Sequence, residues 1–197
     1  DGRTSLACDP LTLQNARYGY SALYNNNVQG ALATFQKEAP KKCPMTDYWL
    51  AYILLQTSPP ARDTARGAAL MEQAAKNGYP EAMYSLGFVY VNGLGGKKDE
   101  TVAREWLNKA GAAGVPAAYT LLGTMDEKTN PARALTYYQR AADQGEPVAM
   151  YNLALLYRDG RGVAKNDFQF NTWLNLSALR QYQPAKQLQA DKMKKKE

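Results

Sequence analysis

The sequence contains no histidine, and this absence excludes many catalytic and metal-binding sites. Its 197 residues include 24 Lys+Arg, 18 Asp+Glu and two Cys, but no imidazole. A Ser-His-Asp triad, a Cys-His pair and a His-ligated metal are therefore impossible, and no side chain has an unperturbed pKa near neutrality. Two cysteines alone do not make a zinc site. We therefore expect no metal, and because the phosphate-binding motif Gly-x-x-x-x-Gly-Lys is also absent, no cofactor.

Long apolar runs are missing as well. Hydrophobic residues make up 45% of the chain, but they occur in runs of only a few residues. A membrane-spanning helix needs about 18 consecutive apolar residues. We therefore expect a globular protein with neither a transmembrane segment nor a signal-peptide core.

Excess charge of one sign is small outside the C-terminal tail. Residues 186–197 hold five Lys, one Asp and one Glu, so this tail supplies +3 of the formal net charge of +6 and the other 185 residues supply +3. A body with so little charge does not favour nucleic acid as a partner. The tail is interpreted as a solubilising helix end, with weak contact to an anionic surface as the alternative.

What the sequence does contain is an internal repeat. The motif Ala-x-Tyr-x-Leu followed by a small residue begins at Ala82 and again at Ala149. Weaker copies begin at Ala16, Thr46 and Ala117, so successive starts are 30, 36, 35 and 32 residues apart. A fixed period of this length is typical of stacked supersecondary units.

Each copy is followed by a second pattern, clearest as Ala-x-x-Tyr-x-x-Arg-Ala-Ala from Ala134. Both patterns place apolar residues three and four positions apart, which predicts α-helices. A glycine follows three of the second helices, and a proline comes two residues later. Glycine is favoured just after a helix and proline at the start of the next. The repeating unit is therefore an antiparallel helix pair, stabilised by stacking on its neighbours.

This double pattern resembles the Sel-like repeat family, a relative of the tetratricopeptide repeats, over about residues 16–181. The resemblance implies an all-α, right-handed α-solenoid that serves as a protein-interaction scaffold and is commonly exported in bacteria. We expect one domain over residues 1–197, made of about five helix pairs and a C-terminal capping helix. The expected units are approximately 9–43, 44–78, 79–114, 115–145 and 146–181, with the capping helix at 183–196.

The two cysteines flank the first predicted helix pair. Cys8 precedes its first helix and Cys43 follows its second, and these ends are neighbours in an antiparallel pair. A disulfide is favoured over two unrelated buried thiols because both cysteines lie in polar connecting segments. It would imply an oxidising compartment. The start at Asp1 without an initiator Met also fits a mature exported chain, although a chain end set by cloning would look the same. A periplasmic location is therefore expected.

By the same resemblance, the first helix of each pair lines the concave, partner-binding face. The repeated tyrosines are explained equally well by packing between repeats, whereas Trp49, Tyr52 and Phe88 are not repeated. Tyrosine, tryptophan and arginine dominate interface energetics. The candidate partner-binding residues are Tyr48, Trp49, Tyr52, Tyr84, Phe88, Tyr119, Tyr151, Asn152 and Arg158.

These observations favour a non-catalytic binding module over an enzyme. None of the five serines has lysine three positions on, and the adjacent carboxylates are placed to cap helices. The most specific interpretation, taken from exported members of the resembling family, is an immunity protein that neutralises a type VI secreted lipase or phospholipase. The alternatives are a periplasmic assembly scaffold, a secreted host-factor binder and, least favoured, a cell-wall or lactam hydrolase.

Overall fold

A computed structural model describes residues 8–56, 63–94 and 98–194. Within these ranges the chain forms eleven α-helices and one short 3-10 helix, and no strand. None of these helices is long and apolar enough to cross a membrane. The α-helices are α1 (Pro10–Tyr24), α2 (Val28–Glu38), α3 (Pro44–Gln56), α4 (Thr64–Lys76), α5 (Pro80–Asn92), α6 (Glu100–Ala112), α7 (Pro116–Asp126), α8 (Pro131–Asp143), α9 (Pro147–Asp159), α10 (Asp167–Leu179) and α11 (Gln183–Lys194).

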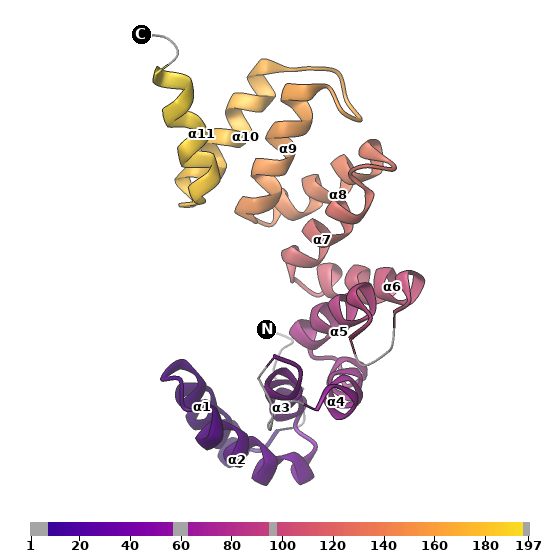
Figure 1. Ribbon diagram of the computed structural model, residues 1–197, viewed down its shortest axis with the longest axis vertical. Coiled ribbons are helices and arrows are strands. Elements are labelled where there is room, and N and C mark those ends of the chain that lie inside the picture. Colours follow the sequence, from indigo (N-terminus) through magenta and orange to yellow (C-terminus); the bar gives the residue numbers. More distant parts are fainter. Residues whose placement is uncertain (1–7, 57–62, 95–97, 195–197) are drawn as a thin grey trace. The chain divides into compact units, whose positions relative to one another are not determined.

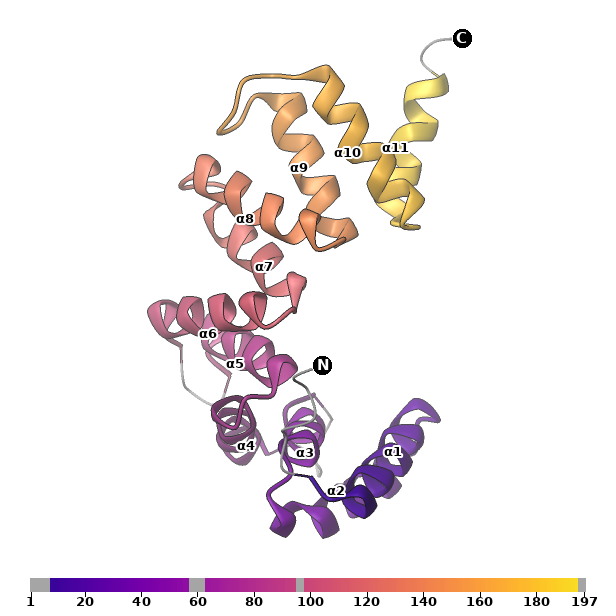
Figure 2. The same ribbon diagram turned by 180° about the vertical axis from the view of Figure 1, so that it is seen from behind.

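Successive helices pack side by side as antiparallel pairs, α1 with α2 through to α9 with α10, and α11 packs on α10 (Figures 1 and 2). This confirms the predicted all-α fold of five helix pairs and a final helix. Residues 195 and 196 of the predicted capping helix lie outside the described residues. Contacts divide the chain into two compact units, one ending at Lys109 and the other beginning at Ala110. The single domain expected from the sequence stays a prediction.

Prolines and glycines set the limits of the helices, as the sequence pattern predicted. Proline occupies the first turn of α5 and α9, where its missing N–H costs no helical hydrogen bond. The second helices α4, α6 and α8 each end two residues before a glycine, and these glycines are Gly78, Gly114 and Gly145, with φ of 87°, 93° and 87°. This left-handed conformation favours glycine, so each helix stops at a fixed position.

The first unit is held together by close contact between small and large residues. Gly87 on α5 lies against Leu107 on α6, and a Cβ at position 87 would be 2.6 Å from the leucine side chain. In the same way, Gly19 on α1 lies against the ring of the buried Phe35 on α2. The small residue of the motif that begins at Ala16 is Ser21, which is exposed, so on this helix Gly19 makes the close contact instead.

The second unit uses the same packing but with a shifted register in its first helix. In α5 and α9 the helix begins at a proline, and a buried small residue follows two positions later. A buried leucine comes six positions after the proline, and a second small residue comes directly after the leucine. In α7 these offsets from Pro116 give Ala118, Leu122 and Gly123, all buried. The fourth repeat therefore begins at Ala118, one residue later than the Ala117 of the sequence motif.

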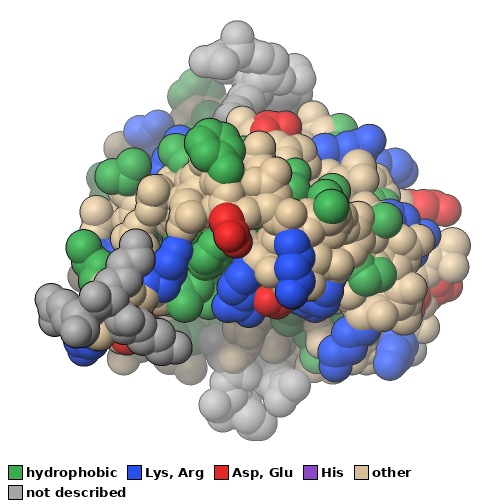
Figure 3. All heavy atoms as spheres, turned by 90° about the horizontal axis from the view of Figure 1, so that it is seen from above, with side chains coloured by type: hydrophobic (Ala, Val, Ile, Leu, Met, Phe, Trp, Pro, Cys, Tyr) green, Lys and Arg blue, Asp and Glu red, His purple; other side chains and the backbone are tan. Residues whose placement is uncertain are grey.

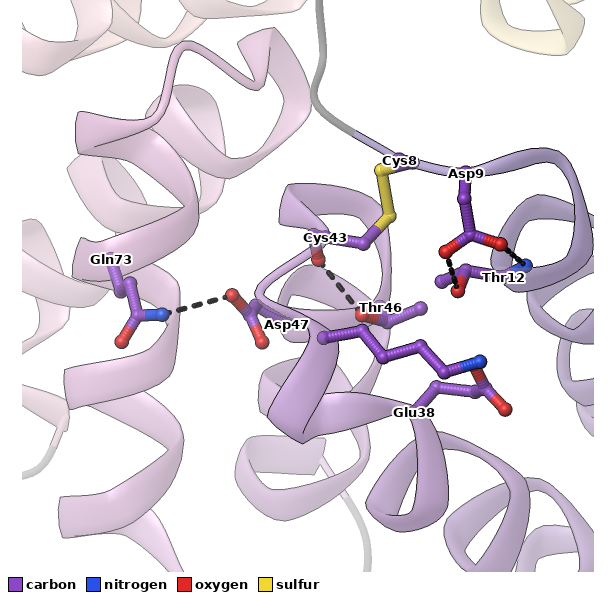
Figure 4. The surroundings of a disulfide bond; sticks show 9 residues. Cys8, Asp9, Thr12, Glu38, Cys43, Thr46, Asp47 and Gln73 are labelled. Atoms are coloured by element: carbon purple, nitrogen blue, oxygen red, sulfur yellow. Dashed lines mark hydrogen bonds and ion pairs between the residues drawn. A yellow bond between two sulfur atoms is a disulfide. The ribbon is translucent and has the colours of Figure 1, made fainter.

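A disulfide joins Cys8 to Cys43, so the start of α1 is tied to the start of α3 (Figure 4). The Cα atoms are 5.0 Å apart, and the Cys43 side chain is fully buried. Polar contacts fix both ends of the bridge. Asp9 caps α1 by accepting hydrogen bonds from the Thr12 backbone and hydroxyl, and the Thr46 hydroxyl donates to the Cys43 carbonyl.

Candidate functional site

Aromatic rings from α1, α3 and the start of α5 form a continuous row in the first unit. The Trp49 ring centroid lies 4.9 Å from that of Tyr20, 5.0 Å from that of Tyr48 and 5.7 Å from that of Tyr52. Tyr48 continues the row to Tyr79, 5.1 Å away. Centroid separations in this range are those of favourable aromatic pairs. We call these five residues the aromatic strip.

Beside the strip, α3 and α5 enclose a hollow of about 300 Å³, which we call the α3–α5 groove. Tyr52 and Phe88 stand at its exposed side, with 41% and 40% of their surface accessible. Aromatic side chains are more often buried than left this open to water. The groove is lined by Tyr48, Tyr52, Leu55, Gln56, Met71, Glu81, Tyr84, Ser85, Phe88, Val89 and Leu94.

Among the described residues that line the groove, Glu81 is the one that carries a charge. It lies in the first turn of α5, where a carboxylate also stabilises the helix dipole. Burial raises the pKa of the Tyr48 phenol, and the charge of Glu81 raises this pKa further. Tyr48 is therefore a neutral hydroxyl at physiological pH. The groove offers aromatic faces, a carboxylate and a few neutral polar groups.

The structure brings five of the nine predicted binding residues together. Tyr48, Tyr52, Tyr84 and Phe88 line the groove, and Trp49 packs beside them in the aromatic strip. They meet because positions 48, 49 and 52 share one face of α3, while 84 and 88 share one face of α5. This grouping contains all three of the non-repeated aromatics.

Tyr119 is not part of an open surface, because the α7 register differs from the sequence motif. Thr120, not Tyr119, occupies the position of Tyr84, and its hydroxyl bonds to Glu146 at 3.0 Å. Tyr119 is 8% exposed and packs directly on Gly111, where an added Cβ would lie 2.6 Å from the ring. Its ring also stacks on Tyr137, with a centroid distance of 6.3 Å. These contacts assign Tyr119 to packing, and we leave it out of the proposed surface.

The other three predicted residues also belong to the second unit and have partners there. Tyr151 packs edge-to-face with Tyr182 at 5.4 Å. Asn152 lies near the Tyr138 hydroxyl and opposes the rise that burial causes in the pKa of that phenol, and Arg158 pairs with Asp159 at 2.7 Å.

Sequence reasoning missed three residues of this surface: Tyr20, Tyr79 and Glu81. Tyr20 could have been noticed in the sequence, because it stands where the other motif copies have leucine. In the structure it is 49% exposed. Tyr79 and Glu81 flank Pro80 in a segment that the motif treats as a connection. Tertiary packing brings them beside α3, where Tyr79 contacts the Tyr48 ring and Glu81 lines the groove with Tyr48.

A buried carboxylate, Asp47, lies on α3 outside the residues that line the groove. It is 1% exposed, and burial raises its pKa to about 6 although Gln73 of α4 donates a 3.1 Å hydrogen bond to it. Figure 4 shows the two side chains facing each other between the helices. In the described part of the chain, no three Cys, Asp or Glu side chains are grouped closely enough to hold a metal.

Stacked antiparallel helix pairs with tight small-to-large contacts define an α-solenoid repeat protein. The chain belongs to the Sel1 repeat family, whose repeat model matches residues 46–79, 80–115, 117–146 and 147–169. These matches cover α3 to the start of α10, so the disulfide-linked α1 and α2 precede the matched part. Sel1 repeats form protein-interaction modules.

Solved structures share the fold. A protective antigen of uropathogenic Escherichia coli is 24% identical with a TM-score of 0.76, over 88% of this chain and 39% of its own. A Sel1 repeat protein of Oxalobacter formigenes has the same identity and TM-score, over 86% of this chain and 71% of its own. An immunity protein of Pseudomonas aeruginosa is 21% identical with a TM-score of 0.60, over 91% of this chain and 68% of its own.

A sequence relative, an uncharacterized protein of Neisseria meningitidis, is 31% identical over 82% of this chain. The chain spans 34% of the length of that relative.

Proposed function

We propose that this chain is an exported, non-catalytic module that holds a protein partner on the aromatic strip and the α3–α5 groove. The observation that supports the proposal most directly is that Tyr52 and Phe88, which line a hollow of about 300 Å³, are both exposed. Concave, aromatic-lined surfaces of this kind are the usual places where a partner's side chains are buried. Trp49 packs against Tyr52 from beside the groove, so the Tyr52 ring is held in place before a partner arrives.

The disulfide supports the proposed export. Bridges of this kind persist in oxidising compartments and are rare in reducing ones. Here the bridge ties the α1–α2 pair to the start of α3, which is the helix that contributes Trp49 and Tyr52. The periplasm is the compartment that we propose.

The most specific form of the proposal is an immunity protein that binds a type VI secreted lipase or phospholipase. Its support is the shared fold of immunity proteins of Pseudomonas aeruginosa. A direct test is co-expression in the periplasm with a lipase effector encoded beside this gene. Rescue of growth and a co-purifying complex are expected. Neither rescue nor a complex would remove the immunity role while leaving the groove to be tested separately.

Site-specific photo-cross-linking tests the binding surface itself. A benzophenone amino acid at position 88, in cells of the source organism, should give a discrete adduct with one partner protein. Phe168 is the matched control, because it is an aromatic residue that is 76% exposed at the start of α10 in the second unit. Adducts at 168 but not at 88 would move the site away from the groove.

A further inference from the structure

We propose that the α3–α5 groove receives an arginine side chain of the partner. This inference rests on the proposed function, because it concerns what the partner presents to the same surface. Three features of the groove support the inference. They are a carboxylate that forms no ion pair with the described residues, aromatic rings that are exposed, and an apolar lining for an aliphatic side-chain stem.

The carboxylate of Glu81 is exposed in the first turn of α5. No Lys or Arg of the described residues forms an ion pair with it, although seven such pairs occur elsewhere in the same ranges. A partner's guanidinium at this position would gain a charge-assisted, bidentate contact. The net charge of the chain is +6, but Glu81 gives the groove a negative charge. This charge attracts a cation to the groove.

Two rings that line the same groove as Glu81, those of Tyr52 and Phe88, are also open to a cation. Elsewhere the chain covers its own ring faces, with Lys109 Nζ 4.4 Å from the centre of the Trp106 ring and Arg140 5.7 Å from that of Tyr119. Among the described residues no cation lies over Tyr52 or Phe88 in this way. An aromatic face attracts a cation through its quadrupole, most strongly where water is partly excluded.

The groove also matches the shape of arginine. Leu55, Met71 and Val89 provide apolar lining for a methylene stem, while Glu81 is exposed and can meet the charged head. A volume of about 300 Å³ accommodates one long side chain. Arginine is favoured over lysine because the planar guanidinium stacks on aromatic rings and sheds water more readily than an ammonium group. The occupant is therefore a peptide segment that projects arginine.

The test uses two capped pentapeptides, Gly-Ser-Arg-Ser-Gly and its citrulline counterpart, which has the same shape without the charge. Binding is followed by NMR on the full chain labelled at the methionine methyl groups. Met71 lines the groove, and Met193, 72% exposed on α11, reports non-specific effects. The arginine peptide should shift the Met71 signal saturably, with a Kd of about a millimolar. Citrulline should bind about tenfold more weakly, and added salt should weaken the arginine complex.

Two variants distinguish the effect of the Glu81 charge on binding from an effect on folding. Glu81→Gln should lower affinity for the arginine peptide about fivefold to tenfold and leave citrulline binding unchanged. Glu105→Gln removes an exposed carboxylate of α6 in the same unit and should change neither affinity. Equal thermal unfolding of the two variants shows that the difference arises at the groove.

Equal affinity for arginine and citrulline, or an arginine peptide that leaves Met71 unshifted, would overturn the inference. The proposed function is judged independently by cross-linking at position 88. An adduct there, combined with equal peptide affinities, would leave the protein-binding role standing and reject only arginine.

Discussion

Gln73 on α4 donates a 3.1 Å hydrogen bond to Oδ2 of the buried Asp47 on α3, while Oδ1 of the same carboxylate is buried and has no hydrogen-bond partner among the described residues. One neutral donor does not offset the loss of water around a charge. Burial therefore raises the pKa of Asp47 to about 6, against its ordinary value of about 3.9.

This relationship predicts that the contribution of Asp47 to stability declines as the pH rises from about 4 to about 6. In that window the folded state binds more protons at Asp47 than the unfolded state does, so each increment of pH favours unfolding until the group is ionised in both states. Asp47→Asn should therefore be more stable than the parent at pH 8, by on the order of 2 kcal/mol, and nearly equal to it at pH 4. Urea unfolding at pH 4, 6 and 8 measures the difference.

Asp143→Asn is the control for this experiment, because Asp143 is an exposed carboxylate at the end of α8 that accepts a 2.7 Å hydrogen bond from Gln139 of the same helix. The parent and this control should show the same pH profile. A stability difference between the parent and Asp47→Asn that does not grow between pH 4 and pH 6 would contradict the assignment to Asp47.

The contact between Gly87 and Leu107 predicts that even a methyl group is costly at position 87. A Cβ there would lie 2.6 Å from Leu107 and 3.3 Å from the Ala103 carbonyl oxygen, and Leu107 is fully buried. Overpacking costs about 1–3 kcal/mol, from which the better helix propensity of alanine recovers up to about 1 kcal/mol. Gly87→Ala should therefore lower the free energy of unfolding by about 1–2 kcal/mol.

A double-mutant cycle identifies the cause. Leu107→Ala leaves a cavity and destabilises the chain, but it also makes room for the new methyl group. The double variant should therefore be more stable than the sum of the two single effects, by about 1 kcal/mol or more. Strict additivity would show that the two positions do not crowd each other.

Removal of the disulfide should lower stability by on the order of 4 kcal/mol, because the bridge closes a loop over a sequence separation of 35 residues. Replacement of Cys8 and Cys43 together by alanine removes the bridge without leaving a single reactive thiol. Denaturant unfolding with and without a reductant checks the effect: the parent should weaken in reductant, and the double variant should not respond. Two freely titrating thiols in the native parent would contradict the bridge.

The sequence patterns were sufficient for the helix pairs and for part of the site. Helical spacing, proline starts and glycine ends are local properties, so they fixed the pairs before any tertiary contact was known. The three non-repeated aromatics Trp49, Tyr52 and Phe88 were found because packing of the repeats does not require them.

The sequence patterns could not determine the register of the motif in α7 or the three-dimensional surroundings of Glu81. Ala117 and Ala118 both fit the small position of the motif, and the burial of Ala118 on α7 shows which of them occupies it. Glu81 carries no pattern of its own, and its place in the groove depends on contacts made in three dimensions. The charge of the whole chain gave no hint of it either: on the face shown in Figure 3, basic side chains lie in separate groups among hydrophobic and uncharged ones.

The different surroundings of Tyr52 and Tyr119 predict opposite consequences for binding and stability. Tyr52→Ala removes a ring that is 41% exposed beside the groove, so it should cost less than about 1 kcal/mol in unfolding free energy. It should nevertheless lower the yield of the cross-link at position 88 several-fold, because truncation of an interface aromatic typically costs more than 1 kcal/mol of binding. Tyr119→Ala opens a cavity beside Gly111 and should cost about 3 kcal/mol in stability. At a temperature where this variant remains folded, its cross-link yield should match that of the parent. A loss of cross-linking with Tyr119→Ala but not with Tyr52→Ala would place the partner on the second unit instead.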